Sequence, residues 1–137
     1  MSTHASNKQA PHPLDPLRPE EVQTVSQTLL KHVGCPAQEL RFKVIDLAEP
    51  AKVQTLQHLR HKGPVPDRRA RVYYHLKGSQ SLLIAIVNIA RKRVEKEVET
   101  PDSQGPVDWH EFELVNKACN SHPEVQAEVA KLKLPRK

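Results

Sequence analysis

Aromatic residues, glycine and cysteine are all scarce in this chain of 137 residues. Phe, Tyr and Trp together make up 4% of it, and there are four glycines and two cysteines. So few aromatic rings leave no platform on which nucleic-acid bases could stack. Four glycines leave little room for a glycine-rich phosphate loop. Two cysteines far apart in sequence exclude a disulfide scaffold and are typical of reduced thiols.

Long apolar runs and a dense charge of one sign are also missing. No apolar run reaches the roughly 18 residues of a spanning helix, so we expect no membrane partner. Lys and Arg number 21 against 16 Asp and Glu, a formal net charge of +5. The densest basic stretches, residues 68–71 and 91–93, lie among acidic residues such as Glu95 and Glu97. This interleaving is typical of a solvated surface, and we predict no nucleic-acid partner.

The two ends of the sequence show no recognisable targeting signal. Residues 1–12 have neither the basic start nor the apolar stretch of a secretory signal. Residues 135–137 are not an SKL-type peroxisomal address. We therefore expect an intracellular location, cytoplasmic or peroxisomal. Residues 1–10 are polar throughout, and we expect them to form a disordered tail.

Proline and apolar spacing predict the first helix. Prolines between His12 and Pro19 fix an extended entry segment. Pro19 suits the first turn of a helix, and Gly34 is suited to end it. One stripe of this helix is apolar, at Val22, Val25, Leu29 and Val33.

A strand and a second helix should follow. Residues 40–44 alternate strictly between apolar and charged side chains, which predicts a strand that Glu49 and Pro50 end. Pro50 can start a second helix with an apolar side formed by Val53, Leu56 and Leu59. An apolar side of this kind is typical of a helix that packs on a core.

Three strands and two helices complete the predicted order. Alternation in residues 69–76 and 94–98, and an apolar run over 82–89, predict strands joined by short turns. Asp108 and Glu111 resemble a capping box, and Ser121 is suited to cap a further helix. The result is an α+β fold with a four-stranded antiparallel meander, a domain over residues 11–107 and a helical segment over 108–137.

No catalytic, cofactor-binding or metal-binding residue can be assigned. His58 and His61 have a spacing that suits two metal ligands on a helix, but no third ligand lies near in sequence. Cys119 falls on an apolar stripe and is expected to be a core thiol, and no base is assigned to Cys35. Other candidates without an assigned partner are Asp46, Glu49, Tyr73 and Tyr74, one of the tyrosines being expected in the core.

Several short segments, in order and spacing, resemble the copper-containing primary-amine oxidases. They are residues 12–17, the Leu40-Arg41-Phe42 strand, the Glu49-Pro50 step, the strand at 68–72, the Asp108-Trp109 helix and His122-Pro123-Glu124-Val125. The resemblance covers residues 11–135 and is to the first small domain of the fungal or peroxisomal-type branch. It implies a cystatin-like α+β domain, followed in the family by a second similar domain and a β-sandwich catalytic domain.

In the family, the catalytic domain holds copper on three histidines and carries a tyrosine oxidised to topaquinone. The resemblance implies oxidative deamination of primary amines to aldehyde, ammonia and hydrogen peroxide by a homodimer. This chain has no His-x-His pair, and its tyrosines follow Val72 and Tyr73 rather than Asn. We therefore predict a catalytically inactive chain that is a non-catalytic domain or fragment of such an oxidase. The alternative is a standalone interaction module that binds an amine oxidase protomer.

Two positions depart from the family pattern. Arg18 stands where the family usually has a capping Ser or Thr, and the turn at residues 89–93 lacks glycine. Each departure is expected to cost about 1 kcal/mol of stability.

Overall fold

The computed structural model describes residues 11–133 of the chain. They fall into two compact units, divided between Gly105 and Pro106. The predicted tail at residues 1–10 lies outside the described residues. The first unit holds the sheet with two α-helices and a short 3-10 helix, and the second holds two helices.

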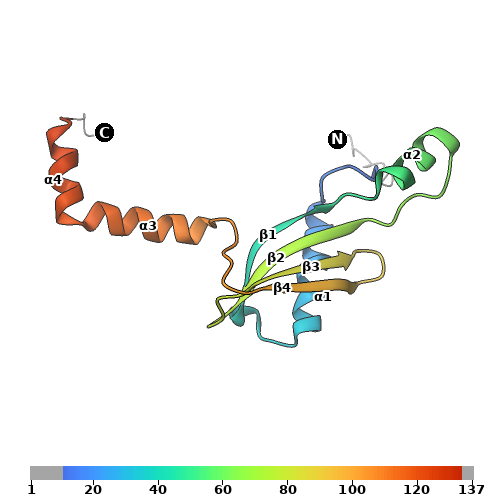
Figure 1. Ribbon diagram of the computed structural model, residues 1–137, viewed down its shortest axis with the longest axis horizontal. Coiled ribbons are helices and arrows are strands. Elements are labelled where there is room, and N and C mark those ends of the chain that lie inside the picture. The colour runs from blue at the N-terminus through green and yellow to red at the C-terminus, as the bar shows by residue number, and fades with distance from the viewer. Residues whose placement is uncertain (1–10, 134–137) are drawn as a thin grey trace, which may run out of the picture. The chain divides into compact units, whose positions relative to one another are not determined.

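The sheet of the first unit is an antiparallel meander, as predicted. Its strands are β1 (Leu40–Ala48), β2 (Arg69–Leu76), β3 (Leu82–Asn88) and β4 (Arg93–Thr100). They lie in the order β1-β2-β3-β4, and each strand pairs antiparallel with its neighbour (Figure 1). A 3-10 helix, η1 (Ala37–Glu39), precedes β1. The α+β fold expected from the sequence is confirmed.

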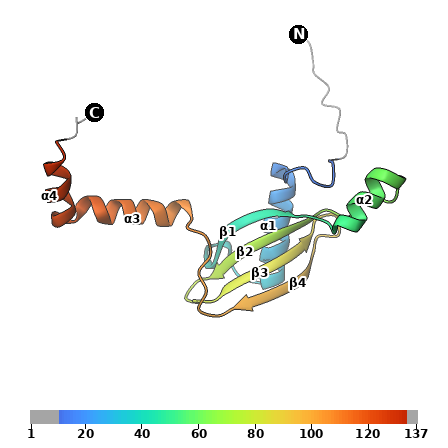
Figure 2. The same cartoon turned by 45° about the horizontal axis from the view of Figure 1, so that its top comes forward.

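Helix α1 (Pro19–Val33) covers one face of this sheet (Figure 2). Its predicted stripe supplies the fully buried Val25 and Leu29, while Val22 and Val33 are half-buried. The strands supply alternate residues to the same core, chiefly Ala70, Val72, Tyr74, Ala85 and Val87. Gly34 ends the helix with φ +70°, a left-handed conformation that glycine adopts without steric cost. The apolar stripe of α1 and the apolar face of the strands therefore pack together in one core.

Helix α1 begins without a capping Ser or Thr, because Arg18 stands at its N-cap position. The Arg18 backbone N–H donates to Glu21 Oε2 at 2.9 Å, which is one half of a capping box. The other half needs a side-chain acceptor at position 18, and a guanidinium group has none. Pro19 lacks an N–H, so one of the unpaired donors of the first turn does not arise.

Helix α2 (Lys52–His61) differs from the prediction of a core-packing helix. Val53 is 66% exposed and Leu59 52% exposed, and Thr55 is the buried residue of this helix. Both views place α2 beyond the ends of β1 and β2 rather than over a face of the sheet (Figures 1 and 2). The helix has the predicted apolar side, but among the described residues of the first unit no element covers it.

The β3–β4 hairpin turns without glycine, as the sequence predicted. Lys92 takes φ +49°, in the left-handed region that side chains disfavour. The β2–β3 turn instead places Gly78 at φ +80°, where glycine is unstrained.

Lys92→Gly is therefore expected to raise the free energy of unfolding by about 1 kcal/mol. The left-handed conformation costs a side chain about 1–2 kcal/mol, and the freedom glycine gains in the unfolded chain offsets part of the relief. Urea unfolding of the variant and the parent chain measures the difference. Ala90→Gly, in the same turn but without a positive φ, is the control and should not stabilise. Equal stability of Lys92→Gly and the parent would contradict the prediction.

The second unit consists of α3 (Trp109–Ser121) and α4 (Pro123–Lys131). The predicted capping box is present, because Asp108 Oδ1 accepts from the Glu111 N–H at 2.9 Å and Glu111 Oε2 accepts from the Asp108 N–H at 3.1 Å. Ser121 does not cap α4 as expected. Its hydroxyl donates to Lys117 O within α3, and His122 stands at the cap position.

Apolar side chains of the second unit are exposed. Trp109 is 74% exposed and stacks on Phe112, with ring centroids 5.6 Å apart. Cys119 is exposed rather than a core thiol, so that prediction is wrong for this unit. The reason is physical: two short helices hold too little apolar surface to bury a stripe between them.

Candidate functional site

The candidate ligand and acid–base residues do not converge in the structure. Residues 11–133 contain no group of three or more His, Cys, Asp and Glu that could hold a metal ion. The His58 ring pairs through Nδ1 with Gly63 O at 3.0 Å, while His61 is exposed. Asp46 Oδ1 accepts from the neighbouring Leu47 N–H, and Glu49 is exposed. These contacts are local and give no chemistry that a substrate would need.

Arg68 forms the most connected polar centre of the described residues, and sequence reasoning missed it. Its side chain is only 9% exposed, so the prediction of a solvated surface for residues 68–71 is wrong at Arg68. Nε and Nη2 donate to the two carboxylate oxygens of Glu21 at 2.7 and 2.9 Å. The same guanidinium donates to main-chain carbonyls of the entry segment, namely His12 at 2.8 Å, Pro13 at 3.4 Å, Asp15 at 3.1 Å and Pro16 at 3.2 Å. We call this group the Arg68 anchor.

The anchor joins three parts of the first unit: the entry segment, α1 and the start of β2. The hydrogen bond from Arg68 holds the pKa of Glu21 below its usual range, against the opposing effect of burial. A carboxylate with a lowered pKa and a fixed partner is a poor general acid. The Arg68 anchor therefore has the chemistry of a structural ion pair.

A second polar centre lies where β2, β3 and β4 meet. The buried Asn88 donates through Nδ2 to Asp67 Oδ2 at 3.1 Å and to Glu95 Oε1 at 3.0 Å. Arg69 Nε donates to Glu95 Oε2 at 2.6 Å, and Arg91 Nε lies 3.6 Å from Asp67 Oδ2. Hydrogen bonds from Arg69 and then Asn88 hold the pKa of Glu95 below its usual range. Both carboxylates are thus neutralised by neighbouring arginines.

Tyr74 is the core tyrosine expected from the sequence, whereas Tyr73 is half-buried. The Tyr74 hydroxyl has no hydrogen-bond partner among the described residues. Burial, and then the negative charge of Glu97, raise the pKa of Tyr74 well above its usual range. Glu97 Oε2 in turn lies 2.9 Å from His32 Nε2 at the end of α1. A buried tyrosine that stays protonated is unsuited to act as a base or nucleophile.

The described helices include none that is long and apolar enough to cross a bilayer. In the described part of the first unit, residues 11–105, the side chains form a packed α+β domain with two structural charge networks.

Comparison with known proteins connects this fold to one family. The profile of the copper amine oxidase N2 domain matches residues 12–99. A copper-containing benzylamine oxidase from Hansenula polymorpha is similar in structure, with a TM-score of 0.68 and 30% sequence identity. The similarity covers 91% of this chain and 20% of the oxidase chain. A search of curated proteins finds no match. The chain belongs to the copper amine oxidase N2 domain family.

The structural similarity reaches beyond the domain profile. The profile ends at residue 99, whereas 91% of the chain is about 125 residues, more than the first unit contains. The similar region of the oxidase therefore includes a counterpart of part of residues 106–137. The chain spans about a fifth of the length of that oxidase.

Proposed function

We propose that this chain is the N-terminal, non-catalytic part of a copper amine oxidase that deaminates primary amines. The observation that supports this most strongly is the domain profile over residues 12–99, together with a similarity that spans only a fifth of a benzylamine oxidase. The rest of such an enzyme would supply the reaction, and the partner of this chain would be those remaining domains, in a homodimer.

Copper and topaquinone belong to this proposal only as groups of the full-length enzyme. The described residues bring together no cluster of ligands suited to a metal, so they do not fit copper. Neither tyrosine is a plausible quinone precursor, because Tyr74 is sealed in the core and neither follows an Asn. We derive no step of amine oxidation from this chain. Its own contribution is to fold and to present surfaces for packing.

The second unit supports the proposal that a further domain follows. Helices α3 and α4 expose large apolar side chains, at Trp109, Phe112, Leu114, Val115 and Val129. Exposed apolar side chains of this size are stabilised when another layer covers them. We propose residues 11–107 as one domain and 108–137 as the helical segment that leads into the next.

The same exposed side chains support the alternative function, a standalone interaction module that binds an amine oxidase protomer. Exposed apolar side chains that cluster, as Trp109 and Phe112 do, are a common mark of an interaction site. The two functions differ in the size of the native protein and in what it releases from an amine.

An antibody against residues 11–135 decides between them. Under the proposed function, a blot of source cells shows a species several times larger than the 15.5 kDa of this chain. Purified with copper, that species releases hydrogen peroxide from a primary amine, while residues 1–137 alone release none. A species near 15.5 kDa that captures an amine oxidase would instead support the interaction module. Peroxide release by residues 1–137 alone would overturn both.

A further inference from the structure

The connection between β1 and β2 carries positive charge that nothing in the described structure neutralises. No Asp or Glu occurs between Glu49 and Asp67, while Lys52, Arg60 and Lys62 lie there. The side chains of these three residues form no ion pair or hydrogen bond with the residues described, 11–133. Basic residues of the neighbouring strands and hairpin behave differently, since Arg68, Arg69, Arg91 and Arg93 are all paired with carboxylates.

Charge and apolar surface share one side of α2. At about 100° per residue, Lys52, Val53, Leu56, Leu59 and Arg60 fall within an arc of about 120°. Val53 and Leu59 are largely exposed, and so is Val65 in the loop that follows. The other side of the helix faces its own unit, because Thr55 is buried and His58 bonds to Gly63 O. We call the exposed side of the helix, together with the exposed Lys62 and Val65 that follow its C-terminus, the α2 stripe.

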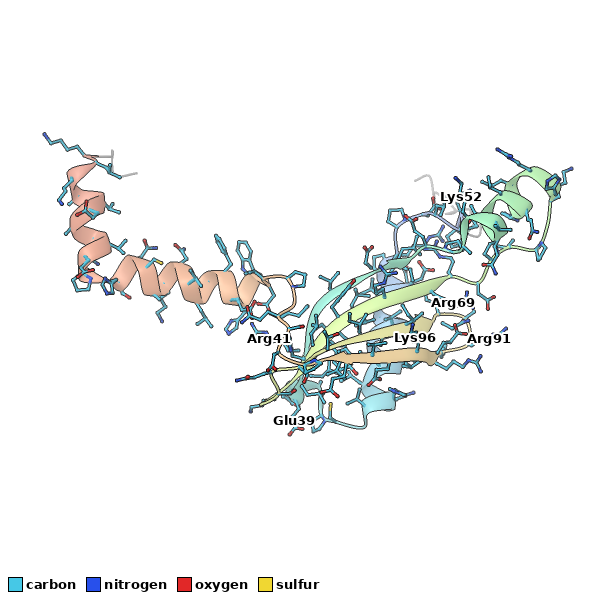
Figure 3. All side chains as sticks on the ribbon, in the orientation of Figure 1. Glu39, Arg41, Lys52, Arg69, Arg91 and Lys96 are labelled. Atoms are coloured by element: carbon cyan, nitrogen blue, oxygen red, sulfur yellow. The ribbon has the colours of Figure 1, made fainter. Side chains whose placement is uncertain are left out.

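The α2 stripe lies on a part of the unit that projects beyond the sheet. Figure 3 shows Lys52 at the start of α2, apart from Arg69 on β2 and Arg91 in the β3–β4 turn. A projecting helix offers a convex surface, whereas a bound peptide helix or strand requires a groove or a free strand edge. A convex surface with cations beside apolar side chains matches the interface of a lipid bilayer, where Lys and Arg meet headgroups and apolar residues enter below them.

We propose that the α2 stripe docks this protein onto the surface of a membrane that contains anionic lipid. The helix would lie in the interface, with Val53, Leu59 and Val65 inserted and Lys52, Arg60 and Lys62 at the headgroups. Docking of this kind needs no spanning segment, so the absence of a long apolar run does not oppose it. It does not depend on the proposed oxidase function, because it rests on residues 50–66 alone.

Vesicle flotation tests the proposal with the full chain. We expect residues 1–137 to float with vesicles of phosphatidylcholine containing 30% phosphatidylserine and to stay unbound with phosphatidylcholine alone. Each neutralised cation should weaken partitioning about fivefold, so Lys52→Gln with Arg60→Gln and Lys62→Gln weakens it about 100-fold. Val53→Ser with Leu59→Ser should also release the chain, since it removes the inserted side chains. Both sets alter exposed side chains, and circular dichroism verifies the fold.

Two matched controls separate the α2 stripe from other causes of binding. Lys31→Gln with Lys77→Gln and Lys117→Gln removes the same charge from exposed positions elsewhere and should leave flotation within about twofold of the parent. Trp109→Ser with Phe112→Ser removes the exposed stacked pair of α3 and should also leave it unchanged.

Three results would overturn the proposal. One is failure of the parent chain to float with anionic vesicles. Another is equal loss of binding in the matched lysine control, which would mean that net charge alone is responsible. The third is saturable binding to polyglutamate or duplex DNA without vesicle binding, which would make the partner a polyanion in solution.

Discussion

Replacing Arg68 by alanine will lower the free energy of unfolding by about 3–5 kcal/mol. The guanidinium bonds both carboxylate oxygens of Glu21 and several main-chain carbonyls of the entry segment. Its removal leaves a largely buried carboxylate without its cation and leaves the segment around residues 12–16 without its anchor. Because a buried charge is left unpaired, removing one partner of a buried ion pair lowers stability by more than removing a surface ion pair does.

Urea unfolding of matched variants measures the effect. Arg68→Lys should lose part of the stability as well, because an ammonium group cannot reproduce the two parallel bonds to Glu21. Arg69→Ala is the control, since its guanidinium is about a third exposed and pairs with Glu95 near the surface. It should cost no more than about 1 kcal/mol. An Arg68→Ala variant as stable as Arg69→Ala would contradict the assigned role of the anchor.

The same comparison should depend on pH in a defined direction. Since Arg68 lowers the pKa of folded Glu21, the anchor stabilises the folded state above the ordinary glutamate pKa. Its contribution is lost as the pH falls through the lowered folded value. The stability difference between the parent chain and Arg68→Ala should therefore be constant near neutral pH and shrink from about pH 5 towards pH 3. A difference that grew on acidification would mean that Glu21 is not the partner.

The second large effect is expected at Tyr74, where the ring and the hydroxyl should act in opposite directions. Tyr74→Ala empties a fully buried site and should cost about 3–5 kcal/mol. Tyr74→Phe keeps the ring and removes a hydroxyl that has no partner among the described residues. It should be neutral or stabilise by up to about 1 kcal/mol, because an unsatisfied buried polar group costs about 1–3 kcal/mol.

Thermal and urea unfolding of both Tyr74 variants make the comparison. Tyr73→Phe is the matched control, because the neighbouring ring is half-buried on the opposite side of the strand. It should change stability by less than about 0.5 kcal/mol. If Tyr74→Phe instead lost more than about 1 kcal/mol, the hydroxyl would have to make a stabilising bond in solution.

The strands and α1 could be predicted because their patterns are complete within the sequence. The alternation in β2 and the apolar stripe of α1 each predict which face is buried. In the structure both faces contribute to one core, through Val72, Tyr74 and Leu29. The short turns between β2, β3 and β4 then make these three strands antiparallel neighbours. Each of these inferences depends on local spacing alone.

Helix α2 and Arg68 show where such reasoning fails. The spacing of Val53, Leu56 and Leu59 predicted the helix correctly, but spacing cannot say whether any layer exists to cover it. The Arg68 anchor depends on carbonyls more than 50 residues away in the chain, which carry no side-chain signature. The sequence predicts no site residue, and the structure contains two charge networks that the spacing of residues could not indicate.

The connection between β1 and β2, residues 49–68, can differ in length without any change in how the four strands pair. Strands β2, β3 and β4 are joined by tight turns and can register against one another through local contacts. Strand β1 must instead close a long loop, but the entropy of closure grows only slowly with loop length. Residues 50–66 of this connection, which leave Asp67 and Arg68 in place, can therefore gain or lose residues at little thermodynamic cost to the sheet. The length of the β1–β2 connection can therefore vary, while the register of β2, β3 and β4 stays fixed.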